Sequence, residues 1–228
     1  MSIFVKKTSA VLADHVKMLV YGAPGVGKTT LIATLPSPII LSAEAGLLSI
    51  AGADLPYIEI ADIGSLEEAY AWLMGSKEAE QFESVALDSI SEIAEICLAD
   101  EMTKTKDGRK AYGEMGIKMN TMLRKFRDLP VHVYMSAKME RAQDESGRML
   151  YGPMMPGGKL ANQLPYLFDE IFAYRVTTSA SGEVMRWLQT QPDESWSAKD
   201  RSRGALDVGE WPNLGDIIEK IKGGMANA

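Results

Sequence analysis

Eight consecutive residues near the start of the chain have the types and spacing that hold a polyphosphate. They read Gly22-Ala23-Pro24-Gly25-Val26-Gly27-Lys28-Thr29 and match the pattern G-x-x-x-x-G-K-[ST] without a departure. Glycines let the backbone curl so that several N–H groups face an anion, while the lysine reaches the β- and γ-phosphates and the threonine hydroxyl ligates Mg²⁺. A strand is expected before this loop, over residues 16–21, and a helix after it, over residues 28–35. We therefore assign the binding of ATP and Mg²⁺ to Gly22, Ala23, Pro24, Gly25, Val26, Gly27, Lys28, Thr29 and Thr30.

A second magnesium ligand is expected at the end of a neighbouring apolar strand. Residues 84–87 predict such a strand, and Asp88 closes it. Because the other acids fall on predicted helix faces or in polar loops, Asp88 is the expected partner of Thr29 at the metal. Motor-type ATPases of the AAA+ group place a water-polarising glutamate directly after this aspartate, whereas the residue here is Ser89. A catalytic base therefore has to come from elsewhere in the chain.

Several short motifs, in their order along the chain, resemble those of RecA-like P-loop ATPases. The apolar run Ile39-Ile40-Leu41 leads into Ser42-Ala43-Glu44, and a later run leads from Tyr134-Met135 into Ser136-Ala137-Lys138. The segment Ala198-Lys199-Asp200-Arg201 is similar to the lysine-x-arginine motif of RadA- and KaiC-type members. Together with residues 109–113 and 164–169, these motifs most resemble phage-encoded, core-only RecA-like ATPases of single-strand annealing and recombination. The resemblance extends from the strand before the phosphate loop to the final helix.

The resemblance implies a catalytic role for four further residues besides Lys28. Glu44 would activate the attacking water, and Ser136 would sense the γ-phosphate, although the family often has glutamine or histidine at that place. Lys199 and Arg201 would reach across a subunit interface to the neighbour's γ-phosphate. The resemblance thus implies a homo-oligomer, either a ring or a filament, with ATP at the subunit interfaces.

Two segments are expected as loops that hold single-stranded DNA, after the third and the fourth predicted strand. They cover residues 103–113 and 140–159, and both contain basic residues and an aromatic residue. Cations that follow phosphates and rings that stack on bases suit single strands without a choice of sequence. The predicted DNA contacts are Lys104, Lys106, Arg109, Lys110, Tyr112, Arg141, Arg148 and Lys159. A single-strand-binding protein is a further possible partner, while Asp144 and Glu145 weaken the second loop.

The element pattern predicts one α/β domain over residues 1–228, with a RecA-like P-loop core. Strands and helices alternate through the first two-thirds of the chain, which is typical of a mainly parallel sheet with helices on both faces. Antiparallel strands and a helix capped by Asn213 are expected to extend it in the last third. We divide the domain into an N-terminal arm (1–16), the P-loop core (17–137), a mobile loop region (138–165) and the C-terminal strands and helix (166–228).

The composition limits the class of protein. A net charge of −7 over 228 residues argues against bulk coating of DNA but leaves room for local basic loops. Cys97 is the only cysteine, so an internal disulfide and a cysteine metal site are excluded. No stretch approaches the ~20 apolar residues of a membrane span, and the N-terminus is not a signal peptide. We expect a cytoplasmic protein without a membrane partner, in the bacterial host if the chain is phage-encoded.

The expected function is DNA-stimulated ATP hydrolysis during homologous recombination, in single-strand annealing or as a mediator. Three alternatives stay open at this point. One is an ATP-dependent assembly switch or scaffold with slow hydrolysis. Another is a small-molecule kinase, for which residues 141–148 would have to form the lid. The third is a packaging or helicase motor.

Overall fold

The computed structural model describes residues 15–44 and 46–226, with the side chains of residues 15–44 and 46–224. Most of the predicted N-terminal arm therefore lies outside the described residues. The strands are β1 (Lys17–Gly22), β2 (Pro38–Ser42), β3 (Tyr57–Glu59), β4 (Ser84–Asp88), β5 (His132–Gln143), β6 (Met149–Pro153), β7 (Glu170–Thr178), β8 (Val184–Gln189) and β9 (Gly209–Glu210). The helices are α1 (Lys28–Leu31), α2 (Ile63–Gly75), α3 (Ile90–Lys104), α4 (Gly108–Arg127), α5 (Gly158–Ala161) and α6 (Leu214–Ala226).

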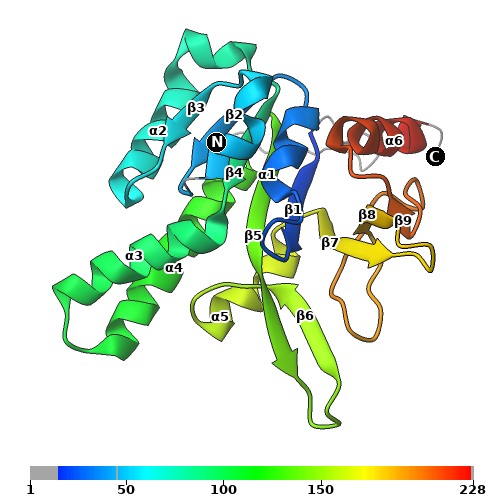
Figure 1. The fold of residues 1–228 in the computed structure, drawn as a ribbon. Helices are drawn as coiled ribbons and strands as arrows, with labels where there is room; N and C mark the ends of the chain where they lie inside the picture. The colour runs from blue at the N-terminus through cyan, green and yellow to red at the C-terminus, as the bar shows by residue number, and fades with distance from the viewer. Residues whose placement is uncertain (1–14, 45, 227–228) are drawn as a thin grey trace, which may run out of the picture.

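The described strands form one sheet in the order β3-β2-β4-β5-β1-β7-β8-β9, with β6 paired to β5 (Figure 1). All pairs from β3 to β7 are parallel, whereas β7–β8, β8–β9 and β5–β6 are antiparallel. The predicted fold class, a mainly parallel sheet extended by C-terminal antiparallel strands, is thus confirmed. Strand β5 lies between β1, which leads into the P-loop (residues 22–29), and β4, which ends at Asp88. A side chain at the carboxyl end of β5 can therefore lie between the P-loop and Asp88.

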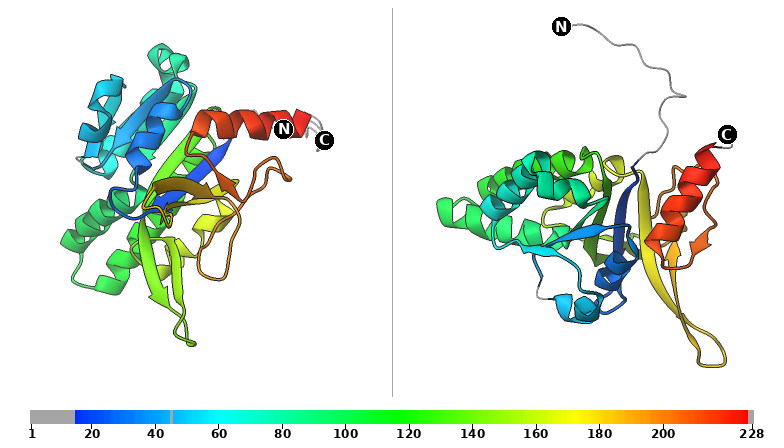
Figure 2. Two further views of the ribbon diagram at one scale, coloured as in Figure 1. Left: turned by 45° about the vertical axis from the view of Figure 1, so that its right-hand side comes forward. Right: turned by 90° about the horizontal axis from the view of Figure 1, so that it is seen from above.

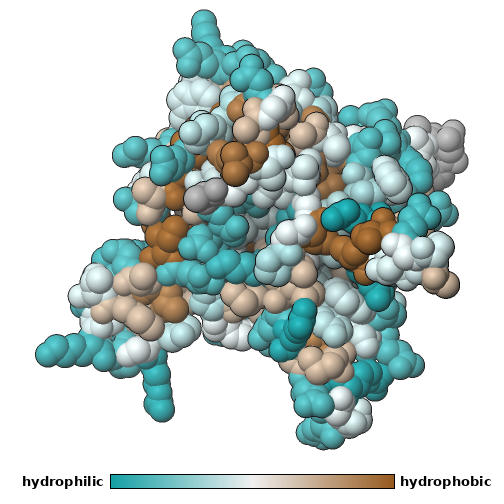
Figure 3. All heavy atoms as spheres, in the orientation of Figure 1, coloured by the Kyte–Doolittle hydropathy of each residue, from teal (hydrophilic) through white to brown (hydrophobic). Residues whose placement is uncertain are grey.

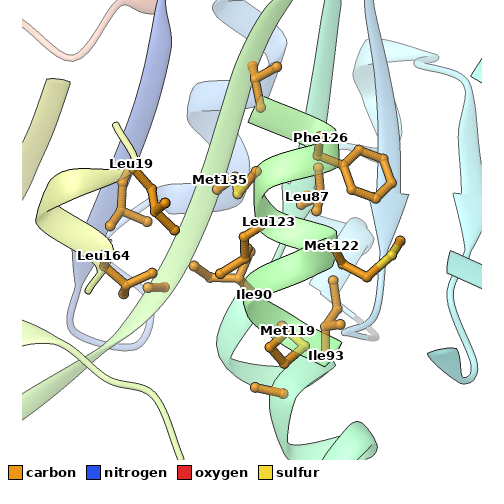
Figure 4. Packing of buried hydrophobic residues seen from close by; sticks show 14 of the residues in the cluster. Leu19, Leu87, Ile90, Ile93, Met119, Met122, Leu123, Phe126, Met135 and Leu164 are labelled. Carbon is orange, nitrogen blue, oxygen red and sulfur yellow. The ribbon is translucent and has the colours of Figure 1, made fainter. Parts of the chain in front are cut away.

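Helices cover both faces of the sheet because residues in its central strands alternate between two apolar cores. On β1, Leu19 and Tyr21 pack with helices α2, α3, α4 and α5, whereas Met18 and Val20 pack with α1 and α6. Figure 4 shows the first core, in which Met119, Met122, Leu123 and Phe126 of α4 lie close to side chains of β4, β5 and α3, among them Leu87, Met135 and Ile93. The methionine face of α4 is therefore core, as its spacing predicts.

The segment 138–165, expected as a mobile loop region, is mostly regular structure. Strand β5 continues through Gln143 and turns back as β6, so that the two form a hairpin that projects from the body (Figures 1 and 2). The expected loop at residues 103–113 is likewise the tip of a helical hairpin, in which only residues 105–107 connect α3 to α4. Residues 196–199 belong to none of these strands, and Trp196 and Lys199 form isolated β-bridges with Tyr151 and Ile171.

Replacing Phe126 with alanine tests the first core. Its ring is 0% exposed and meets Tyr70 edge-on, with ring centroids 5.4 Å apart. We expect Phe126→Ala to lower the free energy of unfolding by about 3–5 kcal/mol, because it leaves a cavity. Ile117→Ala on the same helix is the control, since Ile117 is 65% exposed and the cost there should be about 0.5 kcal/mol or less. Equal losses for both variants in urea unfolding would contradict this packing.

Candidate functional site

The P-loop connects the carboxyl end of β1 to the start of α1. Gly25 and Gly27 have φ of 73° and 114°, a region that favours glycine, and this is how the backbone turns back on itself. The Lys28 ammonium points into the loop and donates to the carbonyls of Gly22 (3.0 Å) and Ala23 (3.2 Å). Burial lowers the pKa of Lys28, and the carboxylates of Glu44 and Asp88 oppose that shift. The lysine is therefore held where phosphate oxygens could replace the two carbonyls.

Thr29 and Asp88 meet beside the P-loop although 59 positions separate them. The Thr29 hydroxyl donates to Asp88 Oδ2 at 2.7 Å, and Asp88 is 2% exposed. A hydroxyl and a carboxylate oxygen side by side are ligands that Mg²⁺ prefers, so the pair fits the metal that the sequence predicts. No group of three acids, cysteines or histidines lies close enough for a metal among the described residues. Thr29 and Asp88 would hold the ion together with phosphate and water oxygens.

Glu44 lies next to Asp88 because β2 and β4 are parallel neighbours in register. Ser42 is opposite Asp88, and the Ala43 N–H donates to the Asp88 carbonyl at 2.9 Å. The Ser89 hydroxyl donates to the Glu44 carboxylate. Ser89 thus holds Glu44 at the carboxyl edge of the sheet, beside the magnesium pair. A carboxylate there can accept a proton from an attacking water.

Ser136 lies on β5, between the strands β1 and β4. It is fully buried on β5, and its hydroxyl donates to Asp88 Oδ1. The Asp88 carboxylate therefore accepts hydrogen bonds from Thr29 on one side and from Ser136 on the other. The role of Ser136 as a γ-phosphate sensor stays a prediction. The hydrogen bond of its hydroxyl in the structure is to Asp88.

Lys199 and Arg201 lie near the opposite, amino end of β7. Lys199 bridges Ile171, and the Arg201 N–H donates to Glu170 Oε1 at 3.2 Å. Tyr174 of β7 pairs with Gly22, the first residue of the P-loop. Glu170 is four strand positions before Tyr174, so it lies about 13 Å from that level of the sheet. The Lys199 ammonium donates to the carbonyls of Pro165 and Phe168, both at 2.6 Å. The exposed Arg201 guanidinium lies beside Asp169, at 3.4 Å.

Three further residues contact the P-loop or Glu44, and the sequence did not predict these contacts. Ser89 holds Glu44, and the Tyr134 hydroxyl donates to the Lys28 carbonyl at 2.8 Å. Arg186 of β8 donates through Nε to the carbonyl of Val26 in the P-loop, at 3.2 Å. A hydroxyl residue directly after the strand aspartate was the available signal for Ser89. Tyr134 and Arg186 left none, because their partners are 106 and 160 positions away.

Ser89→Ala tests whether the serine positions Glu44. Without the hydroxyl partner we expect turnover of ATP to fall about tenfold with unchanged ATP affinity, measured by phosphate release and calorimetry. Ser89 also caps α3 by accepting from the Glu92 N–H at 3.3 Å, so Ser89→Thr, which keeps a hydroxyl, is the matched control. Glu44→Gln should lose more, on the order of 10²-fold or beyond. A Ser89→Ala enzyme with wild-type turnover would show that Glu44 needs no such support.

The buried carboxyl of Glu170 predicts a pH dependence of stability. Burial, followed by the nearby Asp200 carboxylate, raises the pKa of Glu170 from 4.5 to about 8. Between these pH values the folded state binds more protons than the unfolded state. The stability that protonated Glu170 contributes to the free energy of unfolding is therefore fully present below the unfolded pKa, and it is lost as the pH rises through the folded pKa of about 8. Between about pH 5 and about pH 9 we expect the wild type to lose a few kcal/mol more than Glu170→Gln. Parallel pH profiles for the two proteins in urea unfolding would contradict the shift.

Comparison with known proteins places this geometry in a family. A family model described as an AAA domain matches residues 14–202, which include the P-loop, Glu44, Asp88, Ser136 and the segment from Lys199 to Arg201. No curated protein matches the chain. None of the helices in the described part of the chain is both long and apolar enough to cross a membrane. Because the match covers most of the sequence and every part of the site, the chain belongs to the AAA domain family of P-loop ATPases.

Proposed function

We propose that this ATPase is RecA-like and acts on single-stranded DNA in phage or bacterial homologous recombination, as an annealing protein or as a mediator. Magnesium and ATP would be held by the P-loop, Thr29 and Asp88, and Glu44 would activate the attacking water. In this proposal DNA stimulates hydrolysis, and the protein works in the cytoplasm, with a single-strand-binding protein as a further partner.

The observation that favours DNA is the meeting of the two segments expected to bind it. A Cβ atom on Gly157 would lie 3.3 Å from Cδ1 of Tyr112, so the start of α5 packs against the tip of the α3–α4 hairpin. Tyr112 is 43% exposed there and offers a ring for a base. Lys110 precedes Tyr112 by two residues, and Lys159 follows Gly157 by two residues. In this proposal a base of the strand stacks on Tyr112, and cations of the two segments bind the phosphates on either side of it.

The described ion pairs divide the predicted DNA-binding cations into two groups. Lys104 is paired with Asp100 and Glu101, and Arg148 with Asp144 and Glu194. In the described part of the chain, Lys106, Arg109, Lys110, Arg141 and Lys159 have no ion pair. These five cations are the better candidates for phosphate contacts, since they need not give up a carboxylate partner first.

A hydrogen-bonded connection between the two sites supports stimulation by DNA. Ser91 lies three positions after Asp88, and its hydroxyl donates to the Met154 carbonyl at 2.7 Å and accepts from the Lys138 N–H at 2.9 Å. Lys138 belongs to β5, and Met154 directly follows β6. If DNA displaced the β5–β6 hairpin, these hydrogen bonds would transmit the displacement to Ser91, three residues after the magnesium ligand Asp88.

The location of Lys199 and Arg201 supports an oligomer. These residues lie at the far end of the sheet from the P-loop of their own chain, so they could complete only the site of a neighbouring copy. We propose that Arg201, which is exposed, stabilises charge on the neighbour's phosphate, as an arginine supplied in trans does.

ATP turnover measured alone, with single-stranded DNA and with duplex DNA tests the proposed function. Selective stimulation by single strands is the expected result. Equal rates in all three conditions would contradict the proposal and favour a slowly hydrolysing assembly switch.

The double substitution of Lys110 and Lys159 by alanine tests the DNA surface. We expect weaker binding of a fluorescent single strand, and a dependence of log K on log salt that is less steep by about 1 for each lysine removed. Lys104→Ala is the matched control, because its ammonium is already paired. A loss of affinity confined to the control would contradict this surface.

Mixing two inactive proteins tests the contribution from a neighbouring copy. Arg201→Ala keeps an intact P-loop and Lys28→Ala keeps an intact Arg201. We expect Arg201→Ala alone to lose on the order of 10³-fold in turnover, and a mixture with Lys28→Ala to regain part of it. A mixture no more active than its parts would argue against Arg201 acting in trans.

A further inference from the structure

A groove on the outer edge of the sheet begins at Arg186, which donates a hydrogen bond to the P-loop. Its volume is about 280 Å³, and it is lined by Met185, Arg186, Trp187, Gly209, Glu210 and Trp211. Figure 3 shows hydrophobic surface at the place that β7 and β8 occupy in Figure 1. The groove is outside the phosphate and magnesium site, and none of the roles described so far uses it. We propose that it binds the adenine base of ATP, an inference that rests on ATP binding by the P-loop and not on the action on DNA.

The arrangement of the site leaves this side for the base. Glu44 and Asp88, which act at the γ-phosphate end of the nucleotide, come from β2 and β4, on the β5 side of β1. Gly46 is on that side as well, because a Cβ there would lie 3.8 Å from the Thr29 hydroxyl. The base is at the other end of the triphosphate. On the other side of β1 the neighbours are β7 and β8.

Two contacts attach these strands to the P-loop. Arg186 donates to the Val26 carbonyl at 3.2 Å. Tyr174 of β7 packs on the loop, since a Cβ on Gly27 would lie 3.1 Å from its hydroxyl oxygen. Arg186 therefore borders both the loop that holds the phosphates and the groove. In this proposal the nucleotide extends from the P-loop past Arg186 into the groove.

The lining suits a purine ring. Trp211 is 71% exposed, which leaves its indole free to stack on a base. Trp187 forms a wall of the groove: Arg175 covers its ring at 5.0 Å from the centroid, and a Cβ on Gly209 would lie 3.1 Å from its Cε3 atom. Strand β9 pairs with β8 only at Leu188 and Gln189. The edge of β8 before Leu188 therefore leaves backbone groups for the polar rim of a base.

Glu210 holds this groove in place and is not available to the ligand. It is buried, accepts from the Asp207 N–H at 2.8 Å, and is paired with Lys220 of α6 at 2.7 Å. The Trp211 carbonyl accepts from the Asn213 N–H at 2.8 Å, just before α6 begins. Trp211 thus extends from a turn that is fixed to both β9 and α6. A ring presented in this way loses little freedom when a base stacks on it.

Calorimetry with MgATP and with magnesium tripolyphosphate, which has no base, tests the proposal. We expect Trp211→Ala to weaken MgATP binding about tenfold or more and to leave tripolyphosphate binding unchanged. Trp211→Phe, which keeps a stacking face, should retain most of the affinity for MgATP. Tyr166→Ala is the control, because Tyr166 is a 79% exposed ring outside the groove. Lys28→Ala should weaken both ligands.

The outcomes separate this proposal from ATP binding by the P-loop. If wild-type protein binds neither ligand, ATP binding itself is wrong. If Trp211→Ala binds MgATP as the wild type does, or loses both ligands equally, the groove does not hold the base. A Trp211→Ala protein with unchanged ATP affinity but a different oligomeric mass would show that a second copy covers the groove, and this too would overturn the proposal.

Discussion

The buried carboxylate of Asp88 is the group on which the rest of the site depends. A carboxylate removed from water is costly unless hydrogen bonds or a cation compensate it. Here the hydroxyls of Thr29 and Ser136 compensate it from two sides, and they come from the P-loop and from β5. The strand order makes this possible, because β5 separates β1 from β4 and brings Ser136 between them. A magnesium ion bound by Thr29 and Asp88 would supply the positive charge that the two hydroxyls lack.

Glu44, the proposed catalytic acid, and Asp88 lie at the ends of two neighbouring strands, whereas AAA+ motors place the corresponding two acids on one strand. In those motors the acid that polarises water directly follows the strand aspartate, and here that position is Ser89. The parallel register of β2 and β4 brings Glu44 back to the same edge, where the serine hydroxyl holds it. Membership in the AAA domain family is thus compatible with an acid supplied by a neighbouring strand, the arrangement that the resemblance to RecA-like ATPases implies.

The sequence predicted what local patterns encode. The P-loop follows a strand, Asp88 closes another, and Asn213 caps α6 by accepting from the Asp216 N–H at 3.2 Å. Partners distant in sequence were out of reach: Lys199 resembles a catalytic cation, yet its ammonium is bound to two backbone carbonyls. Residues 138–143 were expected in a loop, because the segment is mostly polar, and it is the antiparallel pairing with β6 that makes them a strand. Arg186 and Trp211 gave no signal at all, since their meaning depends on where β8 and β9 lie against the P-loop.

The magnesium dependence of ATP binding tests the central claim most directly. Calorimetry would compare wild type with Asp88→Asn, with Mg²⁺ and with a chelator. We predict that Mg²⁺ tightens ATP binding to the wild type and that Asp88→Asn loses this gain together with turnover, while it still binds the phosphates through Lys28. An Asp88→Asn protein that keeps both the full magnesium gain and wild-type turnover would contradict the account.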